Sequence, residues 1–294
     1  MGIVERSERL ASRMELLVAA DVNRRGSRDL LVPGDLLAAA RSLFAGEGAA
    51  IVTGFYIPQA GAPETDGPPG ALALARALAR LGKRVVLMAD RFCLPLLLHP
   101  AMEPWTAGLT VAEAAPDTGP DWLKGRGVTH VVAVERVGRA EDGHYYDARG
   151  RMLDPYAPPV DRWMWPEPDQ GLVTVGIGDG GNEIGMGKVR HRVRNHAPQG
   201  SRIACVVPAN FLISAGVSNW GAYALIGMLS ELSGIDLLPT PGEEAAVLRA
   251  LVAAGAVDGL SGLQTPTVDG QSPAVLAEML GKLGRLAGGA LRAG

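Results

Sequence analysis

Cysteine is scarce in this sequence, with only Cys93 and Cys205 among 294 residues. The two lie far apart in apolar surroundings, which excludes a disulfide framework and a cysteine-based zinc site. The chain also has no apolar run of the roughly 18 residues that a membrane span needs, and its charged, amphipathic N-terminus lacks the apolar core of a signal peptide. These absences predict a protein of the reducing cytoplasm that has no membrane partner.

An excess of charge of one sign is also missing, because the formal net charge is -3 and the sequence pI is about 6.0. A chain without a basic excess has no electrostatic footprint for nucleic acid, so we predict no nucleic-acid partner. Aromatic residues make up only 5% of the chain, but hydrophobic residues reach 47%, which is enough for a sizeable core. Glycine and proline are plentiful, at 39 and 21 residues, and they favour the loops in which sites are often found.

Short apolar runs rich in β-branched residues alternate with segments of helical periodicity. This alternation is typical of βαβ units and predicts an α/β fold, with a mostly parallel, Rossmann-like sheet in three layers and helices on both faces. We expect one domain over residues 1–294, with an irregular excursion at 138–168. The predicted strands cover 49–54, 85–88, 130–134, 172–175 and 203–207. The predicted helices cover 3–22, 36–45, 71–81, 92–98, 109–115, 117–125, 214 or 218 to 232, 242–254 and 273–291.

The stretch LVTVGIGDGGNEIGMGK, at residues 172–188, is the one around which the rest of the sequence is organised. It predicts a buried strand that leads into a glycine-rich turn, where glycine accepts positive φ and lets a ligand approach the backbone. A tight connection with solvated acids is the alternative. The groups that the turn can offer to a ligand are the side-chain oxygens of Asp179, Asn182 and Glu183 and the N–H groups of Gly180 and Gly181.

Two nucleotide-binding motifs are similar to parts of this turn. Gly176, Gly178 and Gly181 fit G-x-G-x-x-G, but Asp179 would oppose a pyrophosphate and the acid expected about 20 residues later is missing. A P-loop is excluded because Val189, rather than Ser or Thr, follows the Gly-Lys pair. We therefore predict no dinucleotide cofactor, since an acidic glycine turn suits a divalent cation or a substrate ammonium better.

Acidic residues follow four of the predicted strands. The carboxyl ends of parallel strands meet at one edge of an open sheet, where ligands bind. Carboxylates gathered there need a cation or shared protons, and oxygen ligands alone suit Mg²⁺, Mn²⁺ or Ca²⁺. The alternative, which weighs most for Asp90, is that each acid caps a helix separately. The predicted ligands of a Mg²⁺ or Mn²⁺ ion are Glu64, Asp66, Glu135, Asp179 and Glu183.

Basic residues from Lys188 to Arg194 follow the glycine turn. One of them could clamp a substrate carboxylate or phosphate, or together they form a solvated helix face. The same two interpretations apply to Arg136 and Arg139, which follow the third predicted strand.

Five motifs occur in order along the chain: TGFYIP with PETDGPPGA (53–71), ERVGRAEDGHYYDARG (135–150), GIGDGGNEIGMGKV (176–189), AGVSNWGAYAL (215–225) and PTVDG (266–270). Together they resemble the D-glutamate cyclase C-terminal domain family over nearly the whole chain. The resemblance implies an α/β domain and an enzyme that converts D-glutamate to 5-oxo-D-proline with loss of water.

For such a reaction we expect Glu183 to act as a base, and an ion held by Asp66 and Asp179 to polarise the γ-carboxyl group. Two other functions stay open: a Mn²⁺- or Mg²⁺-dependent phosphatase acting on a small phosphorylated metabolite, and a non-catalytic domain that binds a metal ion or small molecule. The expected partner is a small anionic substrate, and association of identical chains stays open. The catalytic candidates are Glu183, Asp179 and Asp66, and the substrate-binding candidates are Arg139, Asn182, Gly180, Gly181 and Asn219.

Overall fold

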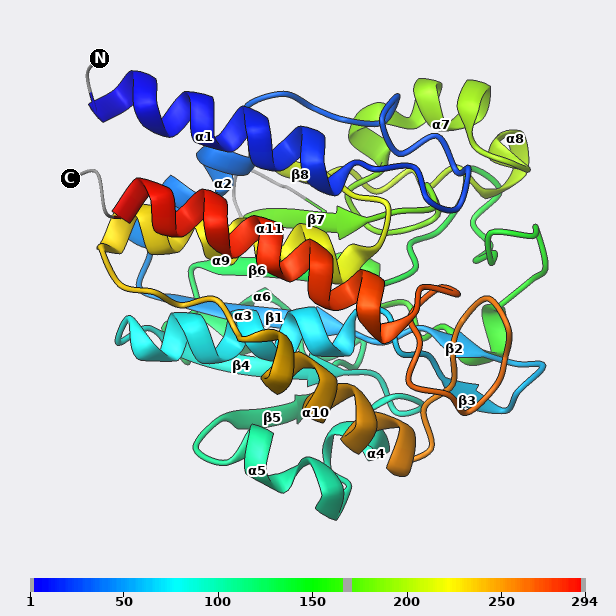
Figure 1. Ribbon diagram of the computed structural model, residues 1–294. Coiled ribbons are helices and arrows are strands. Elements are labelled where there is room, and N and C mark those ends of the chain that lie inside the picture. Colours follow the sequence, from blue (N-terminus) through cyan, green and yellow to red (C-terminus); the bar gives the residue numbers. More distant parts are fainter. Residues whose placement is uncertain (1–2, 166–170, 292–294) are drawn as a thin grey trace.

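A parallel sheet of six strands forms the centre of the fold (Figure 1). The computed structural model describes residues 3–165 and 171–291. The strand order is β5-β4-β1-β6-β7-β8, and each neighbouring pair is parallel. The strands are β1 (Gly48–Thr53), β4 (Arg84–Ala89), β5 (Thr110–Glu113), β6 (His130–Val134), β7 (Val173–Gly178) and β8 (Phe211–Ser214). A small antiparallel pair, β2 (Tyr56–Ile57) and β3 (Ala62–Pro63), follows β1.

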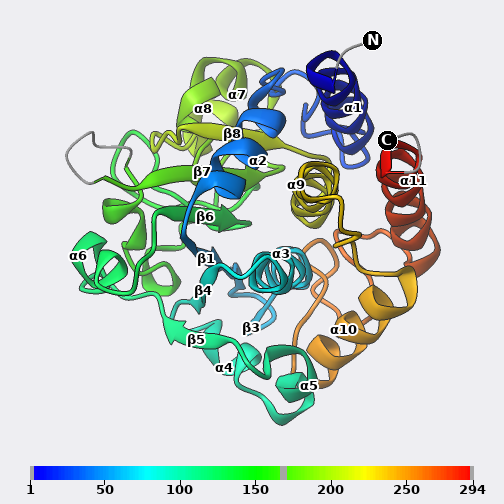
Figure 2. The ribbon, with the colours of Figure 1, turned by 90° about the vertical axis from the view of Figure 1, so that its left-hand side faces the viewer.

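Helices cover both faces of the sheet, but unequally (Figure 2). The long helices lie on one side: α1 (Ile3–Val18), α2 (Asp35–Ala45), α3 (Pro68–Arg80), α9 (Ser218–Ser233), α10 (Pro241–Ala253) and α11 (Pro273–Leu291). The other side has the short helices α6 (Pro120–Lys124), α7 (Arg190–His196) and α8 (Gly200–Ile203), and α4 (Leu94–Leu97) and α5 (Glu103–Thr106) lie near β5. The predicted α/β class is confirmed.

Two apolar cores lie on the two faces of the sheet. Successive strand residues point to opposite faces, so Ile51 of β1 belongs to the core beneath α3 and α9, and Val52 belongs to the core beneath the short helices. After the carboxyl end of β1 the chain passes through Gly54 and the β2–β3 pair before it reaches α3. In Figure 1 this pair lies at the same end of the molecule as the loop between α10 and α11, and the bridge between Glu64 and Val257 joins the two segments.

Two of the predicted elements were wrong. Residues 109–115, expected to be helical, contain edge strand β5, because Thr110–Glu113 pairs with β4 instead of closing helical turns. Residues 203–207, expected to be the fifth strand, begin in α8, and the backbone N–H groups of Cys205 and Val206 bond to loop carbonyls of Gly181 and Arg139. The strand beside β7 is β8, which lies further along the chain.

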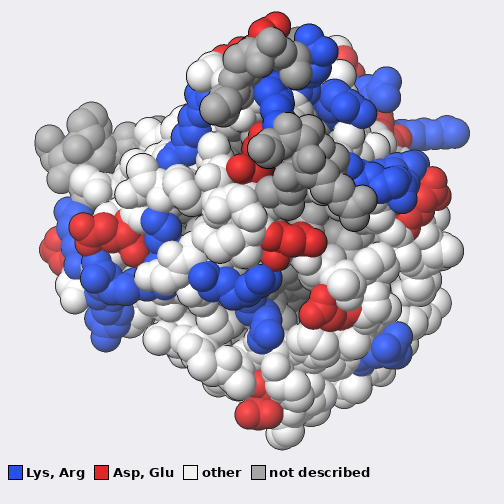
Figure 3. All heavy atoms as spheres, turned by 60° about the vertical axis from the view of Figure 1, so that its left-hand side comes forward, with Lys and Arg blue, Asp and Glu red and all other residues white. Residues whose placement is uncertain are grey.

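The segment from 138 to 165 contains only two short 3₁₀ helices among its described residues, Asp154–Tyr156 and Val160–Trp163. The last residues of the predicted excursion, 166–168, lie outside the described part of the chain. None of the helices in 3–165 and 171–291 is both long and apolar enough to cross a membrane. On the face shown in Figure 3, basic and acidic side chains are interspersed, as the small net charge leads one to expect. The single domain over 1–294 stays a prediction.

Candidate active site

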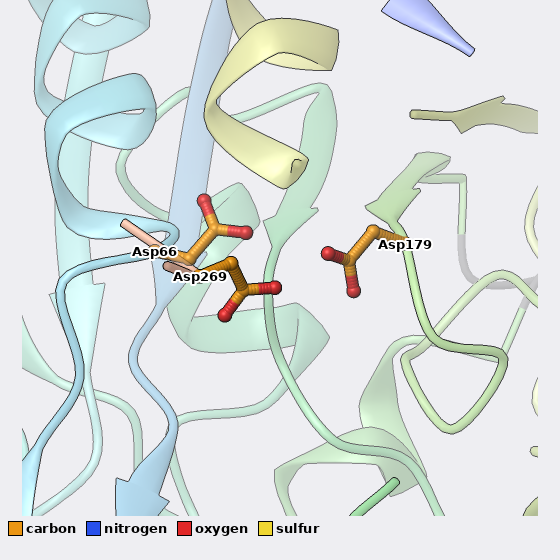
Figure 4. Close-up of side chains that lie close together, drawn as sticks. All are labelled: Asp66, Asp179 and Asp269. Carbon is orange, nitrogen blue, oxygen red and sulfur yellow. The ribbon is translucent and has the colours of Figure 1, made fainter. Parts of the chain in front are cut away.

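Six buried acidic side chains gather at the carboxyl edge of the sheet, and we call them the acidic cluster: Glu64, Asp66, Glu135, Asp179, Glu183 and Asp269. Glu135 follows β6 directly and Asp179 follows β7 directly. Carboxylate oxygens of Asp66, Asp179 and Asp269 lie within 4.8 Å of one another, and so do those of Glu135, Asp179 and Glu183. Figure 4 shows the Asp179 carboxylate directed toward those of Asp66 and Asp269. Asp179 therefore belongs to two groups of three.

Unusual backbone conformations position part of the cluster. Four described non-glycine residues have positive φ, and three of them lie at or beside the cluster: Arg24 at 55°, Glu135 at 47° and Asp269 at 51°. Such conformations are costly for residues with a Cβ atom and are frequent at functional sites. Gly67 also has positive φ, and a Cβ atom there would come within 2.7 Å of the Cβ of Glu135. The chain thus accepts local strain where it directs these carboxylates.

The glycine turn after β7 binds an anion that belongs to the protein itself. The Glu183 carboxylate accepts hydrogen bonds from the N–H groups of Asp179 (3.2 Å), Gly180 (2.6 Å) and Gly181 (2.7 Å). Gly178 has no side chain because a Cβ atom there would lie 2.9 Å from the Glu183 side chain. Gly180 and Gly181, predicted to bind substrate, therefore direct their N–H groups to Glu183.

Asp66 acts as a cap for α9, as the helix-capping alternative expected. Its carboxylate accepts from the N–H groups of Ser218 (2.8 Å) and Asn219 (2.9 Å). The side chain of Asn219, another predicted substrate ligand, accepts from Gly67 and Gly70 and so joins α9 to the start of α3. Both residues stand at the site, but these contacts position the two helices.

Arg25 was missed by the sequence analysis, and it is the one ion-pair partner of the acidic cluster within the described ranges. Its Nη1 lies 2.6 Å from Asp179 Oδ1 and 2.8 Å from Asp269 Oδ2. Arg25 stands in the polar connector after α1, where no periodicity marks it. Asp269 was missed because it follows no strand, although it lies in the quoted motif PTVDG.

The charges of the cluster are far from balanced. Burial, and after it the neighbouring carboxylates, raise the pKa of Glu64 and Glu135 well above the ordinary range. Burial does the same to the pKa of Asp179, although Arg25 acts in the opposite direction. Burial and the nearby Asp269 raise the pKa of Asp66 to about 7. Six carboxyl groups with one guanidinium must share protons or bind a further cation.

A cavity opens beside the cluster. Buried acids line it, among them Glu64, Glu135 and Glu183, and so does Asn182, whose side-chain amide donates to the Tyr146 carbonyl. Three arginines also line it: Arg25, Arg149 and Arg151. Arg149 is exposed and donates to the Leu260 carbonyl, and Arg151 pairs with Asp147. The cavity therefore has buried acids and Arg25 at its inner end, and Arg149 and Arg151 toward solvent.

The arginines singled out from the sequence lie elsewhere. Arg136 is buried, pairs with Asp90 and donates to the Gly54 carbonyl. Arg139 lies 3.6 Å from Asp161 and over the Trp165 ring, and it is absent from the lining of the cavity. In the basic run, Lys188 pairs with Asp35, and Arg190 and Arg194 pair with Glu141, which favours the interpretation as a solvated helix face.

Comparison with known proteins gives a consistent picture. Residues 14–284 match the family described as "D-glutamate cyclase-like, C-terminal". The human protein "D-glutamate cyclase, mitochondrial" is 38% identical over 229 residues, which are 72% of this chain and 37% of that protein. The chain thus spans little more than a third of the length of this curated relative. That relative is named as mitochondrial, and the cytoplasmic location of this chain stays a prediction.

Proposed function

Because this chain belongs to the D-glutamate cyclase-like, C-terminal family, we propose that it is a lyase-type enzyme that cyclises D-glutamate to 5-oxo-D-proline with loss of water. The observation that supports this best is the polarity of the cavity, with buried acids at its inner end and arginines toward solvent. D-Glutamate has one ammonium and two carboxylates. Its ammonium suits the acidic cluster, and its α-carboxylate suits Arg149 or Arg151.

The reaction needs two protons to move from nitrogen to oxygen. The α-ammonium gives up one proton before the amine nitrogen attacks the γ-carboxyl carbon and a second after the C–N bond has formed, and one γ-oxygen leaves as water after it receives both. We assign the transfer to Glu64, which lines the cavity and whose carboxylate makes no side-chain hydrogen bond among the described residues. Burial raises the pKa of Glu64, which makes this carboxylate a stronger proton acceptor. This role replaces the one predicted for Glu183, whose carboxylate is held by backbone N–H groups.

The metal assistance predicted from the sequence is part of the proposal. A divalent ion in the acidic cluster would polarise the γ-carboxyl group and stabilise the negative charge that develops on its oxygens. The donor set consists of carboxylate oxygens alone, which suits Mg²⁺ or Mn²⁺ better than zinc. A phosphatase has less support, because the basic run from Lys188 to Arg194 pairs with Asp35 and Glu141 and not with groups of the cavity.

The test is the formation of 5-oxoproline from D-glutamate, measured by chromatography in the presence of Mn²⁺ or Mg²⁺, with L-glutamate as the stereochemical control. Glu64→Gln keeps the shape of the side chain but cannot transfer the proton, and we expect kcat to fall by at least about 100-fold. Wild-type protein that is folded and supplied with metal, yet forms no 5-oxoproline, would contradict the proposal.

Substrate binding is tested separately with a matched pair of arginines. Arg149→Met should raise KM for D-glutamate with a smaller change in kcat, because it removes a charge at the mouth of the cavity. Arg139→Met is the control, since Arg139 pairs with Asp161 outside the cavity lining. An equal rise in KM for both variants would return Arg139 to the substrate-binding role that the sequence predicted.

A further inference from the structure

The acidic cluster contains two places for a cation, and they share Asp179. One is bounded by Asp66, Asp179 and Asp269, and the other by Glu135, Asp179 and Glu183. We infer that the first place is filled permanently by the guanidinium of Arg25 and that the second binds a single divalent ion. This inference rests on the proposed metal assistance, but not on the identity of the substrate.

Contacts of Arg25 support the first half of this assignment. Its Nη1 touches two of the three carboxylates in the first group, at 2.6 Å from Asp179 and 2.8 Å from Asp269. The third, Asp66, has both oxygens occupied by backbone N–H groups of Gly67, Ser218 and Asn219. A metal ion in this place would have to displace the guanidinium and loosen the cap of α9. The carboxylates of the first group therefore already have their partners within the protein.

The second group has no such partner. Asp179 Oδ1 is used by Arg25, whereas Asp179 Oδ2 has no hydrogen-bond partner, although Asp179 is only 1% exposed. Leaving a charged oxygen buried without a partner is costly, and this oxygen is the atom available to an ion.

Glu135 and Glu183 are arranged to complete the coordination. Glu135 receives a hydrogen bond from the Ser218 hydroxyl on Oε2, which leaves Oε1 free. The N–H groups of the glycine turn fix both oxygens of Glu183. Oε1 accepts from Asp179 and Gly180, whereas Oε2 accepts from Gly181 alone and so keeps a second lone pair. Both glutamates also line the cavity, so an ion held by them would border the space that we propose for the substrate. Mg²⁺ and Mn²⁺ commonly keep several waters in such sites.

This arrangement divides the five ligands predicted from the sequence. Glu135, Asp179 and Glu183 stay as ligands. Asp66 becomes a helix cap, and Glu64 becomes free for proton transfer.

The test counts Mn²⁺ ions bound to the metal-stripped full chain, by calorimetry and by electron paramagnetic resonance of free Mn²⁺. We expect one ion per wild-type chain. Glu183→Gln and Glu135→Gln should each weaken binding at least tenfold. Asp269→Asn is the matched control, because it removes one carboxylate from the other group, and it should change affinity less than threefold. Arg25→Met should bind a second ion, because it empties the first place.

Several results would overturn the inference. Wild-type protein that binds no ion or two ions contradicts it directly. If Asp269→Asn lowers the affinity for Mn²⁺ as much as Glu183→Gln does, the ion lies in the first group. An Arg25→Met variant that is folded by circular dichroism but binds one ion would show that Arg25 does not occupy a cation place. These results are distinct from failure of the proposed reaction, because ion binding without 5-oxoproline rejects the reaction alone, and 5-oxoproline formed in excess chelator rejects the metal assistance alone.

Discussion

Two buried sets of charges lie at the carboxyl edge of the sheet, and the protein treats them differently. Asp90, after β4, pairs one-to-one with buried Arg136 and accepts from the N–H groups of Phe92 and Cys93. Apart from its Nε atom, Arg136 is satisfied too, since it also donates to the carbonyls of Gly54 and Pro158. The acidic cluster, by contrast, has six carboxyl groups and pairs with one guanidinium, that of Arg25, within the described ranges.

The contrast shows that this fold can neutralise a buried charge where only structure requires it. The Asp90–Arg136 pair joins the end of β4 to the segment after β6, and its charges cancel. In the cluster the acidic groups outnumber their cationic partners in the same kind of environment, where unpaired charge is destabilising. Such a surplus is typical of a site that awaits a cation, which here is an ion or the ammonium of a substrate.

The largest expected effect comes from breaking the neutral pair of Asp90 and Arg136. Arg136→Met leaves Asp90 buried without its partner and should lower the free energy of unfolding by about 3–5 kcal/mol. Asp179→Asn removes one charge from the cluster, so without metal it should leave the free energy of unfolding unchanged or raise it. The measurement is urea unfolding of both variants and wild type in excess chelator. If Asp179→Asn lowers the free energy of unfolding as much as Arg136→Met does, the charges of the cluster are as well balanced as those of the Asp90–Arg136 pair.

A smaller effect appears in the pH dependence of stability. Because burial raises the pKa of Asp66 to about 7, the folded state binds a proton more readily than the unfolded state. This contribution to stability is present at low pH and is lost as pH rises through 7. Between pH 6 and pH 8 the loss from Asp66 alone should be about 1.4 kcal/mol in chelator. Saturating Mn²⁺ should suppress it, because the added positive charge lowers the pKa of Asp66.

His130 is the internal control for this pH experiment. It lies at the opposite edge of the sheet, at the start of β6, with its ring nitrogens bonded to Ser42 and Thr129. Burial, with Lys83 nearby, lowers its pKa to about 4, so its contribution to stability is present at high pH and falls by about 0.8 kcal/mol from pH 8 to pH 6. Stability should thus fall with rising pH in chelator and rise with it in Mn²⁺. If the free energy of unfolding has the same slope against pH in chelator and in Mn²⁺, the assignment of excess negative charge to the cluster is contradicted.

The sequence could predict those site residues that follow a recognisable strand, but not those that reach the site from loops. Glu135 and Asp179 could be placed because strands β6 and β7 have clear β-branched runs and parallel strands end at one edge. Arg25 and Asp269 could not, because they reach the site from loops whose paths are set by tertiary contacts, such as the Arg25–Asp269 pair itself.

The same limit explains the misplaced fifth strand. The apolar run at 203–207 has the composition of a strand, but the N–H groups of Cys205 and Val206 donate to the carbonyls of Gly181 and Arg139. Local pattern gives the type of an element only where no long-range partner competes for its backbone. The helix over 273–291, with no such competitor, has the predicted bounds in the structure.

The smallest expected effect is no effect at all, and it concerns nucleotides. The glycine turn after β7 has the N–H groups that cradle a pyrophosphate in dinucleotide-binding proteins, but here they donate to Glu183, and Asp179 adds a second negative charge beside them. An anion site already filled by the protein's own carboxylate has no donors left for phosphate. Titration of wild type with NAD(H) and NADP(H) should therefore give no heat of binding and no shift in Tm, and Glu183→Gln should not create binding, since the amide oxygen still accepts from part of the turn and the Asp179 carboxylate still opposes phosphate. Micromolar affinity of either protein for a dinucleotide would show that the turn opens to phosphate, and the glycines would then have to be explained by a ligand rather than by Glu183.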